Sequence, residues 1–197
     1  GFSHDGEKAL VIPFSKVDGG VVIDYFSNRH DVLEVRRKVR SILLSAKRTF
    51  GQNYLFDLQF IFREFFVHLK NCADTMLAAH VLSPTQKKDL ATSCSLYLPE
   101  YRYWKDDKDG DEEDDSKLVF AGGYNLWKYN ALDAINTFKL YHAILKQLDI
   151  ARSLPQAEEQ FSTIEVFLRI MMKGVKVDID VRSALVTSMT TYLQHAR

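Results

Sequence analysis

The order of short apolar segments and longer amphipathic ones constrains the fold of this chain more than any other feature. Asp5-Gly6 is a dipeptide typical of tight hairpin turns, and the apolar run over residues 9–14 that follows it predicts a strand. A second short strand is expected over residues 21–25. Residues 31–48 then place apolar side chains at helical spacing. The first 48 residues are therefore expected to form short strands followed by one longer amphipathic helix.

The rest of the chain reads mainly as helix. A short strand over residues 49–53 is followed by predicted helices over residues 56–67, 74–82, 84–97 (helical after the first residues of this segment), 125–148, 164–172 and from 180 onward. A break is expected over residues 152–155, where a proline follows a polar turn. With 197 residues, the chain is long enough for one domain of about 150 residues and a helical appendage.

Composition excludes few classes of protein. Hydrophobic residues make up 46% and charged residues 26%, as in ordinary soluble proteins. No uninterrupted apolar run has the roughly 18 residues that a membrane span needs, and the polar start does not resemble a signal peptide. Cys72 and Cys94 lack the spacing of a disulfide framework or a zinc site. They are predicted to be reduced core thiols, as in a cytosolic type of compartment.

Charge is distributed unevenly, although acidic and basic residues balance at 26 each. Residues 106–115 (DDKDGDEEDD) form an acidic run, which leaves the rest of the chain mildly basic. A mildly basic body is compatible with a polyanionic partner. The acidic run does not match a calcium loop: with Gly110 at the sixth position, Lys105 stands first and Ser116 twelfth, where acids are required. A solvated loop is therefore predicted there.

Two short segments carry candidate chemistry. One is Asn53-Tyr54-Leu55-Phe56-Asp57, at a strand-to-helix junction, and the other is Tyr129-Asn130-Ala131-Leu132-Asp133, within a helix. Tyr129 and Asp133 are four residues apart, so they share one helix face. Carboxylates bind hard cations such as Mg²⁺, which activate water and stabilise a leaving oxygen. These residue types therefore suit metal-assisted hydrolysis of a phosphodiester.

In this order, the two segments resemble the motifs of a known family. Residues 53–57 are similar to the second exonuclease motif of family-A DNA polymerases (bacterial polymerase I type), and residues 129–133 to the third. The intervening Asp74-Thr75-Met76-Leu77 looks like the family's Asp-Thr-Met-Leu helix. Residues 103–107 and 126–133 resemble phage and organellar members in particular. The resemblance covers nearly the whole chain.

The resemblance implies an α/β fold of the ribonuclease-H-like type, with a mixed sheet flanked by helices over residues 1–150. It implies that Asp57 and Asp133 are carboxylates of a site for two Mg²⁺ or Mn²⁺ ions, and that Tyr129 orients the attacking water. Asn53 and Phe56 would contact the nucleotides at the 3′ end of DNA. Asp74 is expected to cap a helix.

One departure from the family's pattern is large. The family's first motif, Asp-x-Glu at the end of an apolar strand, supplies two further metal carboxylates. Asp5-Gly6-Glu7 spells this motif, but Asp-Gly is hairpin chemistry and no buried apolar strand precedes it. In the family, a Gly-Phe-Ser type of segment follows the Asp-x-Glu strand. That strand is therefore expected in a longer parent chain or in another chain.

The C-terminal part resembles the junction at which family-A polymerases enter the thumb. A helix is predicted to end at Gly174, a short extended segment follows, and Asp178 or Asp180 can cap the last helix. Residues 151–197 would thus be the helical start of the polymerase region. The apolar face of the last helix is expected to be partly exposed or packed on another chain; it consists of Val181, Leu185, Met189 and Leu193.

The expected function is therefore proofreading by a DNA-directed DNA polymerase, with DNA and dNTPs as partners and no membrane. The expected location is a bacterial or phage-infected cytoplasm or an organellar matrix. Two alternatives stay open. One is an RNA-trimming exonuclease of the ribonuclease D type, which shares the motifs. The other is a non-catalytic nucleic-acid-binding module with a decayed exonuclease fold.

Overall fold

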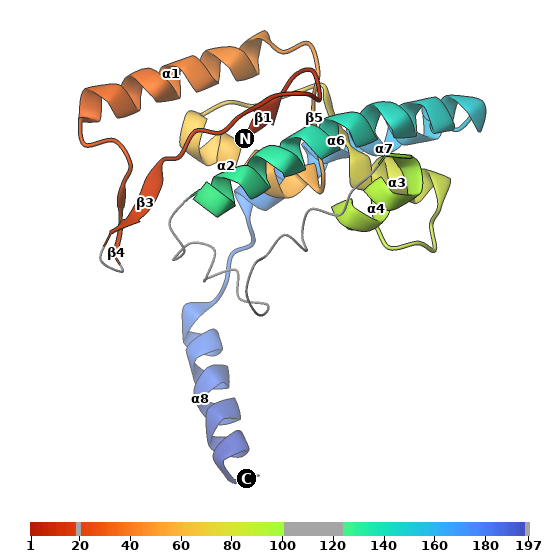
Figure 1. Ribbon diagram of the computed structural model, residues 1–197. Coiled ribbons are helices and arrows are strands. Elements are labelled where there is room, and N and C mark those ends of the chain that lie inside the picture. Colours follow the sequence, from red (N-terminus) through yellow and green to blue (C-terminus); the bar gives the residue numbers. More distant parts are fainter. Residues whose placement is uncertain (19–20, 101–123, 196–197) are drawn as a thin grey trace.

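The computed structural model describes residues 1–18, 21–100 and 124–195. The acidic run over residues 106–115 lies outside the described residues, and so do residues 103–107, which carry part of the family resemblance. Figure 1 shows an α/β molecule in which helices surround short strands, with one helix extending away from the rest. The α/β class predicted from the sequence is confirmed.

The described strands form three two-stranded sheets. β1 (Phe2–Ser3) pairs antiparallel with β2 (Ala9–Leu10), β3 (Ser15–Asp18) pairs antiparallel with β4 (Val21–Asp24), and β5 (Thr49–Gly51) pairs parallel with β6 (Cys72–Asp74). The single mixed sheet expected from the sequence does not form among these residues. β1 and β5 each pair with one strand only, so each keeps an unpaired edge.

Seven helices follow from the described part of the sequence, and Figure 1 labels them. They are α1 (Arg29–Ser45), α2 (Tyr54–Phe65), α3 (Thr75–Leu82), α4 (Leu90–Tyr97), α6 (Tyr124–Ile150), α7 (Leu154–Lys173) and α8 (Ile179–His195). The long helix predicted over residues 125–148 is confirmed. None of the helices described is both long enough and apolar enough to cross a membrane.

Two predicted boundaries were wrong for identifiable reasons. α7 begins at Leu154 rather than at residue 164, because Pro155 stands in the first turn of the helix, where its missing N–H costs no hydrogen bond. The strand predicted over residues 9–14 ends at Leu10. Pro13 has no N–H to donate to a sheet.

The turn at Asp5-Gly6 has the predicted hairpin chemistry. The Oδ1 atom of Asp5 accepts hydrogen bonds from the backbone N–H groups of Glu7 (2.8 Å) and Lys8 (2.9 Å). Gly6 has φ +72°, a backbone conformation that residues other than glycine rarely adopt. This turn joins β1 to β2 and brings both strands against α6.

α6 and α7 form the centre of the core. Leu140, Ile144 and Leu148 of α6 are buried, and α6 contacts α3, α4, α7, β1, β2 and β5. α7 buries Ala157, Phe161, Ile164 and Leu168 and contacts β6, α2 and α3. The buried apolar side chains of both helices belong to one cluster with those of α1, α2 and α3.

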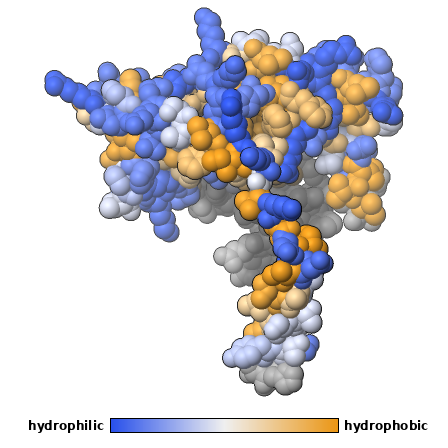
Figure 2. All heavy atoms as spheres, turned by 180° about the vertical axis from the view of Figure 1, so that it is seen from behind, coloured by the Kyte–Doolittle hydropathy of each residue, from blue (hydrophilic) through white to orange (hydrophobic). Residues whose placement is uncertain are grey.

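α8 does not share this core. It extends away from the body of the molecule, as Figures 1 and 2 show from opposite sides. The prediction of a partly exposed apolar face on the last helix is confirmed, since Val181, Leu185, Met189 and Leu193 are all exposed. α7 ends at Gly174, which has φ +70° and donates its N–H to the carbonyl of Ile170 (2.9 Å). The predicted glycine C-cap is therefore confirmed.

Candidate active site

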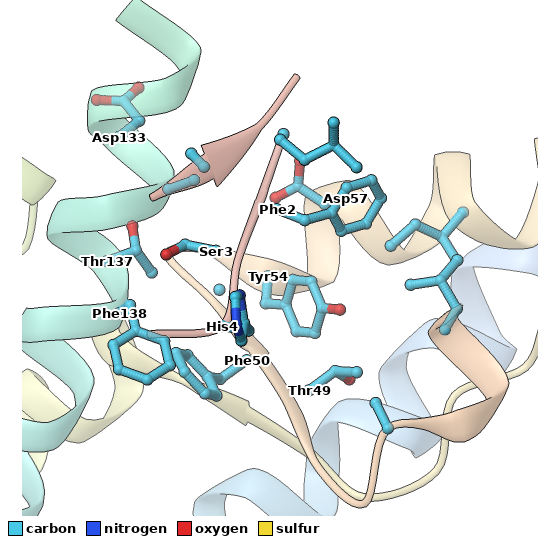
Figure 3. A pocket seen from close by; sticks show the side chains of 18 of the residues that line it. Phe2, Ser3, His4, Thr49, Phe50, Tyr54, Asp57, Asp133, Thr137 and Phe138 are labelled. Carbon is cyan, nitrogen blue, oxygen red and sulfur yellow. The ribbon is translucent and has the colours of Figure 1, made fainter. Parts of the chain in front are cut away.

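A cavity of about 990 Å³ lies between β1 and β5. Residues 1–4 at β1 and residues 49–52 at β5 line two of its sides. α2 and α6 supply two candidate metal-site carboxylates, those of Asp57 and Asp133 (Figure 3). The two aspartates stand 76 positions apart in the sequence (133 − 57), yet the fold brings both to one cavity. We call this cavity the slot.

Asp57 reaches the slot because of the sharp junction between β5 and α2. Asn53, the residue before α2, has a left-handed backbone with φ 53°, a conformation that asparagine tolerates better than most residues. Gly51 makes room for the turn: a Cβ atom there would lie 2.4 Å from the ring of Tyr54. α2 therefore starts immediately after the strand and presents Asp57 in its first turn.

Asp74 holds this junction in place. Gly51 and Asp74 are paired in the parallel sheet, so the side chain of Asp74 lies beside the start of α2. Its carboxylate accepts the backbone N–H groups of Asn53 (3.0 Å), just before α2, of Tyr54 (2.8 Å), the first residue of α2, and of Met76 (2.7 Å) in α3. The expectation that Asp74 caps a helix is confirmed, and the same carboxylate also positions the segment that carries Asp57.

The surroundings of Asp57 disfavour its negative charge. Desolvation by the neighbouring protein raises the pKa of Asp57 above the ordinary value of a carboxyl group, and the charge of Asp74 acts in the same direction. The positive charge of the Gly1 amino group opposes them. A cation beside Asp57 would stabilise the ionised carboxylate, so the site fits a metal ligand electrostatically.

Asp133 and Tyr129 lie on consecutive turns of α6. Asp133 is half-buried and lines the slot together with Asn130, Ala134 and Thr137. Tyr129 is half-buried and packs against the hydrophobic core, and its side chain is not part of the slot lining. The structure thus places Tyr129 one helical turn from the carboxylate but outside the slot itself.

Asn53 and Phe56, the two candidate nucleotide contacts, are exposed at the start of α2. Phe56 precedes Asp57 directly, and its ring lies 5.1 Å from that of Phe60, centroid to centroid. Phe60 also lines the slot. Neither Asn53 nor Phe56 lines it, so they flank its α2 side.

Asp5 and Glu7, which spell Asp-x-Glu, make other contacts in the structure. Asp5 is engaged in its own turn, and Glu7 lies near the ammonium group of Lys139 (3.5 Å). Neither residue lines the slot, although their neighbours His4 and Lys8 do. Within residues 1–18, 21–100 and 124–195, no group of three or more His, Cys, Asp or Glu side chains could hold a metal ion.

The sequence motifs pointed to Asp57 and Asp133 but not to Phe60 or to the second role of Asp74. A signal for Phe60 was available, because it stands four residues after Phe56 on a helix. The contact between Asp74 and the start of α2 could not be read from spacing, since it depends on the register of two parallel strands.

The sequence of the chain was compared with protein families and with curated proteins. The family model described as 3′–5′ exonuclease, from family-A DNA polymerases, matches residues 3–149. The match includes both segments that carry the candidate carboxylates. No curated protein matches the chain. Since the family model covers most of the sequence, the chain belongs to the 3′–5′ exonuclease family of family-A DNA polymerases.

Proposed function

We propose that this chain is the proofreading part of a DNA-directed DNA polymerase and that it removes nucleotides one at a time from single-stranded 3′ ends of DNA. One observation carries the proposal: the carboxylates of two motifs, remote in sequence, line a single slot in a chain that belongs to the exonuclease family. The slot is open to solvent on its α2 side, where Asp57 and Phe60 are exposed.

Asp57 and Asp133 are the residues that would hold divalent metal, Mg²⁺ or Mn²⁺. Two carboxylates supplemented by substrate phosphates match the ligands that Mg²⁺ takes in proteins. When bound, a pair of such ions polarises the scissile phosphate, activates a water molecule and stabilises the leaving oxygen. Within the chain, Asp74 fixes the segment that bears Asp57, and Tyr129 would orient the attacking water through its hydroxyl group.

The slot itself would receive a further strand. β1 and β5 flank it, and each has an edge unpaired among the described residues. Apolar side chains such as Phe2, Ile61 and Phe65 make up much of its wall. A strand placed there would pair with both edges and join the sheets into the expected ribonuclease-H-like mixed sheet. Ending in Asp-x-Glu, it would bring the two carboxylates that complete the metal site.

Preference for mismatched 3′ ends over matched ones would follow if the site accepts only single-stranded DNA. Mispaired ends separate from the template more readily than paired ends, so the energy of unpairing favours excision of mismatches. A site that binds single strands through stacking and phosphate contacts needs no base-specific hydrogen bonds. The DNA, the polymerase region and its dNTPs are parts of this proposal.

The test uses a protein that carries this chain together with the Asp-x-Glu strand. Asp57→Ala or Asp133→Ala should abolish 3′ excision and leave polymerisation nearly unchanged. Tyr129→Phe should have a milder effect, because it removes one hydroxyl group and no metal ligand. Asp149→Ala, an exposed change on the same helix as Asp133, serves as the control. Equal loss of both activities in the aspartate variants would show that these residues support the fold instead.

A ribonuclease D type of exonuclease is the second candidate. The packing of α7 favours it, because residues 154–173 form an integral layer of the core rather than a separate polymerase element. The exposure of α8 favours the polymerase. Trimming of single-stranded RNA and DNA of one sequence distinguishes the two: the polymerase proposal predicts faster trimming of DNA, and faster trimming of RNA would contradict it.

A further inference from the structure

α2 carries an exposed aromatic pair beside the slot. Phe56 is 57% exposed and Phe60 is 50% exposed. Their ring centroids are 5.1 Å apart, with the ring planes inclined by 58°. Since the two residues are four positions apart, they form one continuous surface along the helix.

This surface is continuous with the candidate active site. Phe56 adjoins Asp57 in the sequence, and Phe60 is itself a wall of the slot that contains Asp57 and Asp133. A polymer that approaches Asp57 along α2 from the C-terminal end of the helix would therefore pass Phe60. A charged residue follows the pair on α2.

That charged residue is Arg63, which lies three positions after Phe60 and shares its helix face. Arg63 is exposed. The nearby acid, Glu64, is engaged by Arg36 at 2.7 Å, which reduces its repulsion of an anion. The order along α2 is thus Phe56, the carboxylate of Asp57, Phe60 and the cation Arg63.

From this order we propose that the Phe56–Phe60 pair is a stacking surface for the bases of a single DNA strand whose 3′ end lies at Asp57 and Asp133, and that Arg63 contacts a phosphate of the same strand. The proposal rests on the proposed function and names the path of its substrate. Aromatic faces stack on any base, so the surface would accept every sequence.

The experiment measures binding of a short oligothymidine by the full chain, in an Asp133→Asn background and in Ca²⁺ so that cleavage does not interfere. Phe60→Ala should weaken binding by roughly fivefold or more, and Phe60→Tyr should restore it. Phe167→Ala is the matched control, because Phe167 is 52% exposed on α7 and does not line the slot. It should leave the affinity unchanged.

An oligonucleotide with abasic sites near its 3′ end separates stacking from other effects. On that probe, Phe60→Ala and the parent chain should bind equally. Arg63→Ala should reduce the slope of log affinity against log salt by about 0.7, the value for one phosphate contact on a single strand. An equal affinity of Phe60→Ala and the parent for intact oligothymidine would overturn the proposal, while metal-dependent excision in the Proposed function assay would still stand. Absence of oligothymidine binding by the parent chain would also overturn it.

Discussion

The buried side chain of Asp74 holds the backbone segment that carries Asp57. It is 2% exposed, and its two carboxylate oxygens accept three backbone N–H groups from the starts of two helices. Burial raises the pKa of its carboxyl group, while those hydrogen bonds oppose the shift. An asparagine offers one acceptor oxygen in place of two, and its amide nitrogen would face an N–H group.

Asp74→Asn is therefore expected to lower the free energy of unfolding by about 2 kcal/mol or more, since at least one buried donor loses its partner. Denaturant unfolding measures this change. Asp178→Asn is the matched control, because Asp178 caps α8 at the surface through a single oxygen that asparagine can supply. A loss of equal size in the two variants would contradict this role of Asp74.

Replacement of Asp57 by asparagine should raise the stability of the chain, whereas the same replacement of Asp74 should lower it. Desolvation raises its pKa, so folding favours its protonated form. The contribution of Asp57 to stability is fully present below its unfolded pKa and is lost as the pH rises through its folded pKa. Asp57→Asn should thus stabilise the metal-free chain at neutral pH, and the gain should vanish in acid. Thermal unfolding in EDTA across this pH range measures it, and a destabilised variant at neutral pH would contradict it.

At this scale the sequence was informative where a motif carried the chemistry. Asp57 and Asp133 were predicted from their motifs, and both line the slot. The proximity of Phe60 to the slot and the three hydrogen bonds of Asp74 were not predicted, because they arise from contacts between segments that are distant in the chain. The predicted nucleotide contacts of Asn53 and Phe56, and the predicted role of Tyr129 in orienting water, stay predictions.

The junction between β5 and α2 depends on a close approach of the Gly51 backbone to the ring of Tyr54. Gly51 ends β5, and a Cβ atom there would meet the Cδ2 atom of the buried Tyr54 at 2.4 Å. Gly51→Ala should destabilise the chain by about 1–3 kcal/mol, the usual cost of overpacking. Replacing Tyr54 with leucine in the same chain should recover part of the loss. Thermal unfolding of the single and double variants decides this; additive losses would show that the two residues do not clash.

Element types were predicted better than element boundaries. α6 was predicted nearly to its ends, because a long periodic pattern has few alternatives. α7 was predicted ten residues too short (164 − 154), since a proline is compatible with both a break and a first helical turn. The sheet was the least predictable element. β1 and β5 belong to different two-stranded sheets, and hydrophobic periodicity does not report which strands meet.

At the scale of the whole molecule, the helix before residues 174–178 is packed into the core and the helix after them is not. α7 buries four apolar side chains in the core, and Arg48 beside β5 makes two hydrogen bonds with Glu158 of α7 (2.9 and 2.8 Å). α8 exposes its apolar residues. Periodicity alone could not tell these two helices apart, because both have apolar residues at helical spacing.

Two truncations test this difference. A chain that ends at Gly174 should unfold cooperatively with nearly the midpoint of the full chain, because residues 179–194 of α8 are all exposed. A chain that ends at Ile150 should lose cooperative unfolding, since the core residues that pack on α7 become exposed. Denaturant unfolding of the two chains compares them. Equal stability of the shorter chain would place α7 outside the exonuclease domain.

The central claim is that the slot holds half of a metal site and that a strand ending in Asp-x-Glu completes it. The direct measurement is Mg²⁺-dependent digestion of a 5′-labelled single-stranded oligonucleotide by two proteins. One is residues 1–197, and the other is the same chain with an apolar strand ending in Asp-x-Glu fused before Gly1 through a short linker. The fused protein should produce a ladder of products shortened from the 3′ end, and residues 1–197 should trim slower by orders of magnitude, because they lack two carboxylates. Robust trimming by residues 1–197 alone would contradict the claim and would favour Asp5 and Glu7 as metal ligands.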